Sequence, residues 1–179
     1  MAITPDSLND PQARQAVKLF YDLLPPSRWD GGRKPSGERV GTVVRVLSEE
    51  AAAPARATLS ALLDADSAQA SGKQAAQAAL ARIVLTQALR SADTAPMVQQ
   101  AIDEAAKPNM GLLDPRLGEL IIGMLLATTT FDRDADGSLH VHLGGGAAGI
   151  LSALKVPELL EKLPAVLAAL PASVLAHLL

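Results

Sequence analysis

The chain has 179 residues, enough for one domain with a sizeable core but too short for two ordinary domains. Apolar residues, mostly Ala, Leu and Val, make up 49% of the chain and aromatic residues only 2%, a composition that favours a folded, helical protein over a disordered one. The 16 basic and 19 acidic residues leave a net charge of −3, which argues against nucleic-acid binding through a global basic field, and the lack of cysteine excludes disulfides, thiol nucleophiles and thiolate metal sites.

Targeting and membrane segments are not expected from the sequence. The opening MAITPDSLND has neither a basic region nor an apolar run, so we expect no signal peptide. The most apolar interior run, residues 120–127, is far shorter than the roughly 20 residues that span a bilayer. We therefore expect a cytoplasmic protein without a transmembrane span or a cofactor.

Helix signals punctuate the first third of the chain. Asp10 is a candidate cap and Pro11 suits a first turn, and apolar residues then recur at helical spacing until Pro25 and Pro26. Ser36 is a candidate cap for a second helix over residues 36–50. The valines of that segment also suit a strand, so helix is the preferred interpretation and strand the alternative.

Four further helical segments are expected before residue 128. One begins at Pro54, and a long one begins at Ser71. Thr94 is expected to cap the next helix, with Pro96 in its first turn. Asp114 and Pro115 then restart a helix that is apolar nearly all round, which predicts a central position in the fold.

The stretch FDRDADGSLHVHLGGG, residues 131–146, is the densest polar cluster and predicts a β-hairpin at about 128–143. Asp134 and Asp136 suit a type I turn, and Gly137 supplies the positive φ of the bulge that follows it. This register separates an apolar face from a polar face. The expected pairs are Arg133–Leu139, Phe131–Val141 and Thr129–Leu143 on the first face, and Asp132–His140 and Thr130–His142 on the second.

Two metal sites compete with the hairpin as interpretations of the same residues. A calcium loop matches at its first positions, but its twelfth position is Leu143, which cannot bind the ion. Asp132, His140 and His142 supply the donors of a zinc or iron site, and this remains an alternative function, as a metal-binding protein or metal-dependent enzyme. A solvent-exposed polar face of a hairpin produces the same pattern, so neither metal site is favoured.

The loop GGRKPSGER, residues 31–39, offers a second alternative, an anion-binding or ligand-binding helical domain. Backbone amides at a helix start can hold an anion, and the candidate residues are Gly32, Arg33, Lys34, Ser36 and Gly37. The segment is not a phosphate-binding P-loop, because Glu38 follows the last glycine where lysine is required. An ordinary solvated loop is the simpler interpretation.

The C-terminal segment contains prolines seven residues apart, at Pro157, Pro164 and Pro171. Either each proline starts a short helix or the prolines kink one continuous helix. An apolar stripe accompanies them in both cases, and we predict that it serves association with other proteins. The predicted interaction residues are Leu160, Leu163, Leu167, Leu170 and Val174.

The sequence therefore predicts a mainly α protein of five to seven helices with one β-hairpin and a proline-punctuated helical tail. We divide it into a helical domain, residues 1–143, and a glycine joint with an amphipathic tail, residues 144–179. The preferred function is a non-enzymatic interaction or adaptor module that binds another protein or a second copy of itself through apolar helical surfaces. No catalytic residues are predicted, because no nucleophile has an evident base.

Overall fold

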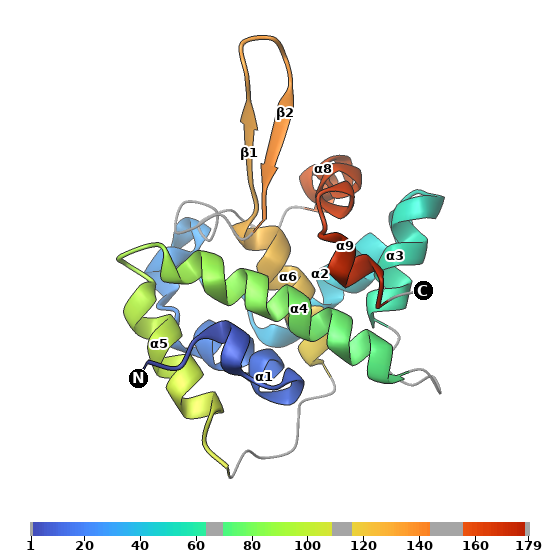
Figure 1. The fold of residues 1–179 in the computed structure, drawn as a ribbon. Coiled ribbons are helices and arrows are strands. Elements are labelled where there is room, and N and C mark those ends of the chain that lie inside the picture. Colours follow the sequence, from blue (N-terminus) through green and yellow to red (C-terminus); the bar gives the residue numbers. More distant parts are fainter. Residues whose placement is uncertain (1, 64–69, 109–115, 144–155, 178–179) are drawn as a thin grey trace.

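The computed structural model describes residues 2–63, 70–108, 116–143 and 156–177 and is mainly helical. Figure 1 shows a cluster of helices from which a single two-stranded hairpin projects. The elements are η1 (Pro5–Ser7), α1 (Asp10–Leu23), η2 (Pro26–Arg28), η3 (Asp30–Gly32), α2 (Gly37–Glu50), α3 (Ala53–Leu63), α4 (Ala70–Leu89), α5 (Ala95–Ala105), α6 (Leu117–Thr128), β1 (Thr130–Arg133), β2 (Leu139–His142), α8 (Val156–Ala168) and α9 (Ala172–Leu175). The predicted fold class is confirmed, and the described ranges hold eight α-helices because the tail is divided at Pro171.

Helix α1 begins one residue earlier than predicted. The side chain of Asn9, not of Asp10, accepts a hydrogen bond from the Gln12 amide at 2.9 Å, and the Gln12 side chain accepts one from the Asn9 amide at 3.0 Å. The two bonds form a capping box. Asp10 lies in the first turn and instead pairs with Arg82 of α4 at 2.8 Å.

Residues 37–50 form helix α2, so the helix prediction is confirmed and the strand alternative is wrong. Ser36 caps this helix as predicted, with its hydroxyl accepting from the Arg39 amide at 3.2 Å. Val40 and Val44 are four residues apart and both are buried on the same face. Burial of that face outweighs the modest preference of valine for strands.

Thr94 precedes α5 as expected, but the capping role predicted for its side chain is wrong. The Thr94 hydroxyl makes no cap bond and donates instead to the carbonyl of Ala88 at 2.5 Å. The residue is fully buried, so this bond satisfies a carbonyl at the end of α4. Thr94 thereby ties the end of α4 to the start of α5.

Helix α6 is central, as its apolar sequence predicted. Every residue from Leu117 to Thr128 is buried except Glu119, and α6 contacts α1, α2, α3 and α4 (Figure 1). The predicted start at Asp114 and Pro115 lies outside the described residues. A helix that is apolar on all sides is stable in water only when other elements surround it.

Two glycines let the neighbouring helices approach α6 closely. A Cβ atom on Gly123 would lie 2.2 Å from Cγ1 of Val40 on α2, and one on Gly118 would lie 2.2 Å from the side-chain nitrogen of Gln77 on α4. Gln77 is buried, and its amide donates to the carbonyl of Leu62 on α3 at 2.6 Å. These contacts fix the spacing of α2 and α4 against α6.

The hairpin has the predicted register. Gly137 has φ +88°, its amide donates to the Asp134 carbonyl at 2.9 Å, and the Asp134 amide donates to the Ser138 carbonyl at 2.9 Å. The observed pairs are Thr130–His142, Phe131–Val141, Asp132–His140 and Arg133–Leu139. The expected pairing of Thr129 with Leu143 does not occur, because Thr129 caps the end of α6 and donates its hydroxyl to the Leu125 carbonyl at 2.5 Å.

The C-terminal helices combine both interpretations of the proline repeat. Pro164 lies inside the continuous helix α8, whereas Pro171 precedes the separate helix α9. Helix α8 packs against α2 and α3, and α9 packs against α4. The tail therefore contributes to the same hydrophobic core as the preceding helices, while the predicted glycine joint at 144–149 lies outside the described residues. The core residues of the tail are Leu163, Val166, Leu170 and Val174.

The contact between α2 and α6 leads to a first prediction. Gly123→Ala should destabilise the fold by about 1–2 kcal/mol, because overpacking against the stiff Val40 side chain outweighs the better helix propensity of alanine. Gly37→Ala is the matched control, since its Cβ would meet no atom within 4 Å. Urea unfolding measures both variants, and a Gly123→Ala protein as stable as wild type would contradict the close approach.

Candidate functional site

The hairpin places its histidines against aspartates on one face. Nε2 of His140 lies 2.7 Å from the Asp134 carboxylate, and Nε2 of His142 lies 3.2 Å from the Asp132 carboxylate. All four side chains are more than half exposed. The three predicted metal candidates lie on neighbouring positions of the hairpin but do not share one centre. His142 pairs with Asp132, whereas His140 pairs with Asp134. Within the described ranges no group of three or more such side chains has a geometry that could hold a metal ion.

The aspartates at the hairpin tip stabilise the turn. Asp136 accepts a hydrogen bond from the Ser138 amide at 2.9 Å, and this bond lowers the pKa of the Asp136 carboxyl. Asp134 uses its main chain to close the turn and its side chain to contact His140. These contacts are those of an Asx-stabilised turn, as the hairpin interpretation required.

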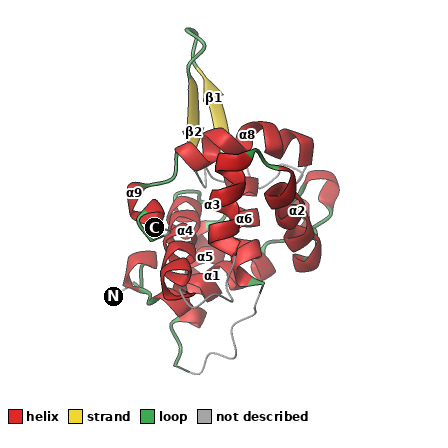
Figure 2. Ribbon diagram, turned by 90° about the vertical axis from the view of Figure 1, so that its right-hand side faces the viewer, coloured by secondary structure: helices red, strands yellow, loops and turns green. Residues whose placement is uncertain are grey.

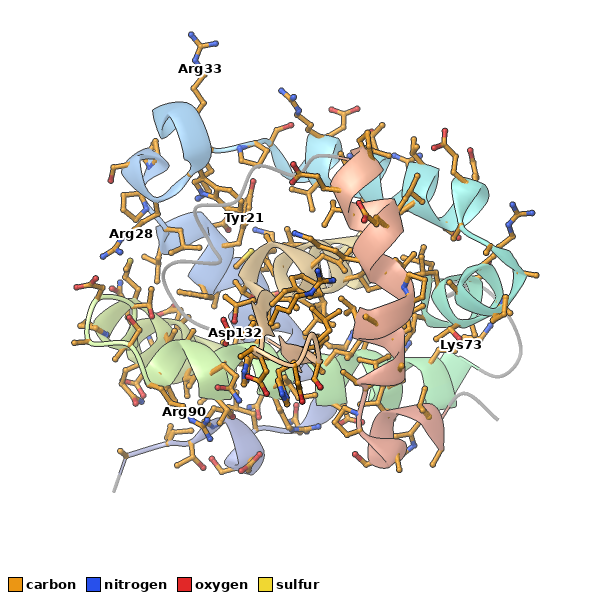
Figure 3. The ribbon with its side chains drawn as sticks, turned by 90° about the horizontal axis from the view of Figure 1, so that it is seen from above. Tyr21, Arg28, Arg33, Lys73, Arg90 and Asp132 are labelled. Carbon is orange, nitrogen blue, oxygen red and sulfur yellow. The ribbon has the colours of Figure 1, made fainter. Side chains whose placement is uncertain are left out.

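The predicted anion loop contacts the C-terminal end of α1. Nζ of Lys34 donates to the carbonyls of Asp22 at 3.0 Å and Leu24 at 3.1 Å, and it lies 4.5 Å from the centre of the Tyr21 ring. Burial lowers the pKa of Lys34, and the Asp22 carboxylate opposes that shift. Figure 3 shows Arg33 pointing away from the helices, so Lys34 and Arg33 do not converge on one point.

The glycines and the serine of this loop also have structural roles. Gly31 and Gly32 have φ of +68° and +66°, a left-handed backbone that favours glycine. The Ser36 hydroxyl accepts a hydrogen bond from the Arg39 amide, so this amide is not free to bind an anion. A cavity of about 220 Å³ lies beside the loop, and its charged lining residues are the acidic Asp22 and Glu38 and the basic Lys18 and Arg116. Because these charges balance, the cavity does not select an anion by its charge.

Tyr21 lies beneath this loop and has a perturbed pKa. Its ring packs edge-on against Trp29 with centroids 5.9 Å apart, and its hydroxyl donates to the Pro35 carbonyl. Burial, aided by the nearby Asp22 carboxylate, raises the pKa of Tyr21 to about 12. The buried, hydrogen-bonded phenol anchors the loop over the end of α1.

The predicted interaction stripe is divided between the core and the surface. Leu163, Leu170 and Val174 are at most 5% exposed and pack inside their own chain, so they are not available to a partner in this structure. Leu160 and Leu167 are half-buried. The seven-residue spacing thus marks the face of the tail that covers the core. Only the margin of this face, which includes Leu160 and Leu167, reaches solvent.

That margin forms an apolar groove between α3 and α8 that the sequence analysis did not identify. The groove has a volume of about 410 Å³. Leu175, one of the two large apolar side chains classed as exposed in the described chain, is 36% exposed and lines it. The remaining lining residues are Ala52, Pro54, Ala55, Thr58, Pro164, Leu167 and Ala168.

A second groove lies at the base of β2, between the hairpin, the end of α4 and the start of α9. It has a volume of about 350 Å³, and Arg90 and His142 are the basic residues that line it. Arg90 is exposed at the end of α4 and appears beside the end-on hairpin in Figure 3. This groove combines residues far apart in the sequence and was also not predicted.

Comparison of the chain with protein-family models, curated proteins and solved structures finds no significant match. No helix of the described residues is long and apolar enough to cross a bilayer.

A second prediction follows from the environment of Tyr21. Because this is the chain's only tyrosine, phenolate absorbance reports its ionisation alone. The native protein should titrate with a pKa of about 12, against about 10 after unfolding. Since the folded state retains the proton longer, the contribution of Tyr21 to stability is complete below pH ~10 and is lost as the pH rises towards ~12. A native midpoint near 10 would contradict burial of the phenol.

A third prediction concerns the positive φ of Gly137. Gly137→Val should destabilise the hairpin by about 1 kcal/mol or more and speed exchange of the Asp134 amide proton about fivefold. Ala135→Val is the control, because positive φ among the described residues occurs only at glycines. Hydrogen exchange measured by NMR distinguishes them, and equal protection in both variants would contradict the bulged turn.

Proposed function

We propose that the protein is a non-enzymatic interaction module that binds an apolar helix of another protein in the groove between α3 and α8. The observation that carries this proposal is the groove of about 410 Å³, whose walls are almost entirely apolar. Clefts of this size that expose apolar side chains are typical binding surfaces rather than ordinary solvent-facing surface.

The shape of the groove favours a helical occupant. Helices α3 and α8 form its two walls, and the small side chains of Ala52, Ala55 and Ala168 leave space for apolar side chains of a helix laid across them. An amphipathic helix that lays its apolar face into such a groove is a recurrent mode of recognition. Leu167 and Leu175 supply the larger apolar contacts on the side of the tail.

The lining of the groove supports a partner with an apolar face. Thr58 is the one polar residue among those that line it. An apolar centre is also the usual feature of a protein interface. The expected ligand is therefore a helix with apolar residues at i, i+3, i+4 and i+7 and polar residues elsewhere.

The fourth prediction tests this surface by site-specific photo-crosslinking in cells of the native host. A photoreactive amino acid at Ala168, exposed on the groove wall, should give a discrete adduct, and mass spectrometry should place it on an apolar helical segment of a partner. The same amino acid at Ala57, exposed on α3 but not part of the groove, is the matched control and should give no such adduct.

Leu175→Glu provides the energetic test. Because Leu175 is 36% exposed, the substitution should lower the melting temperature less than a charge at the fully buried Val174 would, yet a charge in the groove should abolish the adduct at Ala168. An adduct that survives Leu175→Glu, or that forms equally from Ala57, would refute the groove as the binding surface.

A further inference from the structure

The hairpin projects from the helical body with both of its outer edges unpaired in the part of the chain that the structure describes (Figures 1 and 2). The Asp134 amide donates to the Ser138 carbonyl, and hydrogen-bonded pairs alternate along an antiparallel ladder. The main-chain groups of Leu139 and Val141 therefore point outward from β2, and those of Phe131 and Arg133 point outward from β1. Each edge offers donors and acceptors to another strand.

The two edges differ in charge. Strand β1 carries Asp132 and Arg133, and charged side chains on an edge strand oppose pairing with a further strand. Strand β2 has the sequence LHVH, without any Asp, Glu, Lys or Arg. It also holds Leu139, the most exposed of the large apolar side chains in the described residues, at 46%. The edge of β2 is thus the one suited to strand addition.

We propose that β2 pairs with β2 of a second copy of this chain in antiparallel orientation, so that the two hairpins form a four-stranded sheet around a two-fold axis at His140. Leu139 of each copy then lies opposite Val141 of the other, and their outward amides and carbonyls bond across the axis. The apolar side chains of both hairpins share one face of this sheet, and the histidines and aspartates share the other.

Charge complementarity supports a second copy as the occupant. Antiparallel pairing brings the tip of each hairpin to the base of the other. Asp134 at the tip and His142 at the base already pair with His140 and Asp132 of their own hairpin. The charges that remain for the contact are Asp136 at the tip and Arg90 in the groove beside the base of β2. Asp136 is fully exposed, and its hydrogen bond from Ser138 keeps it ionised to lower pH than an ordinary aspartate. In the proposed dimer, Asp136 of each copy therefore approaches Arg90 of the other, so this contact forms twice.

This association uses a surface separate from the groove between α3 and α8. Neither strand of the hairpin lines that groove, and no residue of α3 lines the groove beside β2. The dimer and the partner-binding groove can therefore fail independently in experiment.

The fifth prediction is a concentration-dependent dimer with a dissociation constant in the micromolar range, as expected for a small interface. Leu139→Pro removes an outward amide of β2 without removing a bond to β1, and it should make the protein monomeric in sedimentation velocity. Arg133→Pro, at the opposite position on β1, is the matched control and should remain dimeric. A monomeric wild type at ~500 µM, or equal dissociation in both variants, would overturn the proposal.

A cysteine at the proposed axis tests the register directly. Because the chain contains no cysteine, His140→Cys introduces a single thiol, and opposed residues of an antiparallel pair have Cβ atoms ~5 Å apart. Mild oxidation should convert most of this variant into a disulfide-linked dimer. Asp132→Cys lies on the same face but one strand away from the axis, so it should crosslink far less. Equal crosslinking would contradict the axis at His140.

Charge reversal tests the contact between tip and groove. Arg90→Glu should raise the dimer dissociation constant about tenfold, because two copies of the contact become repulsive. Arg39→Glu, which changes an exposed arginine on α2, should leave dimerisation nearly unchanged. If both variants raised the dissociation constant to a similar extent, the effect would come from net charge, and the proposed contact between tip and groove would be wrong.

Discussion

Burial of α6 on every side is the constraint that organises the other helices. Because α6 has no polar face, α1, α2, α3 and α4 must all contact it. Gly118 and Gly123 set how close α4 and α2 approach, since a side chain at either position would overlap Gln77 or Val40. The one partly exposed residue, Glu119, contacts Arg45 of α2 at 3.3 Å, which gives this carboxylate an ionic partner at the edge of the core.

The same helix determines where the hairpin stands. Strand β1 begins two residues after α6 ends, and the hydroxyls of Thr128 and Thr129 donate to carbonyls of the last turn, at Met124 and Leu125. The connection from the buried helix α6 to β1 is therefore short and hydrogen-bonded rather than a long loop. On the other side, Nζ of Lys162 on α8 lies 4.8 Å from the centre of the Phe131 ring. The base of the hairpin is held from two directions while its tip remains exposed, which suits an element that meets another molecule.

Local patterns in the sequence predicted local structure well. The register of the hairpin was predictable because only one pairing separates Phe131 and Val141 from the polar face, and Gly137 is the residue that the bulge requires. The position of Asn9 rather than Asp10 at the start of α1 was not predictable, since both residue types cap helices well. Neither groove was predictable, because each combines segments more than 50 residues apart whose proximity depends on the packing of α6. The stripe in the tail was recognised as apolar, but spacing alone does not distinguish a chain's own core from a partner.

The break at Pro171 explains how one tail serves both the core and a surface. Helix α8 ends at Ala168, shortly before Pro171, which has no amide hydrogen to donate to the preceding turn, and α9 then begins at Ala172 and packs against α4. Val174 is then buried, while its neighbour Leu175 lines the groove with Leu167 and Ala168 of α8. Pro164, by contrast, does not break the tail. Helix α8 continues through Pro164, and the ring of this proline lines the groove without adding a hydrogen-bonding group. The break at Pro171 thus lets the tail complete the core through Leu170 and Val174 while Leu167 and Leu175 line the groove.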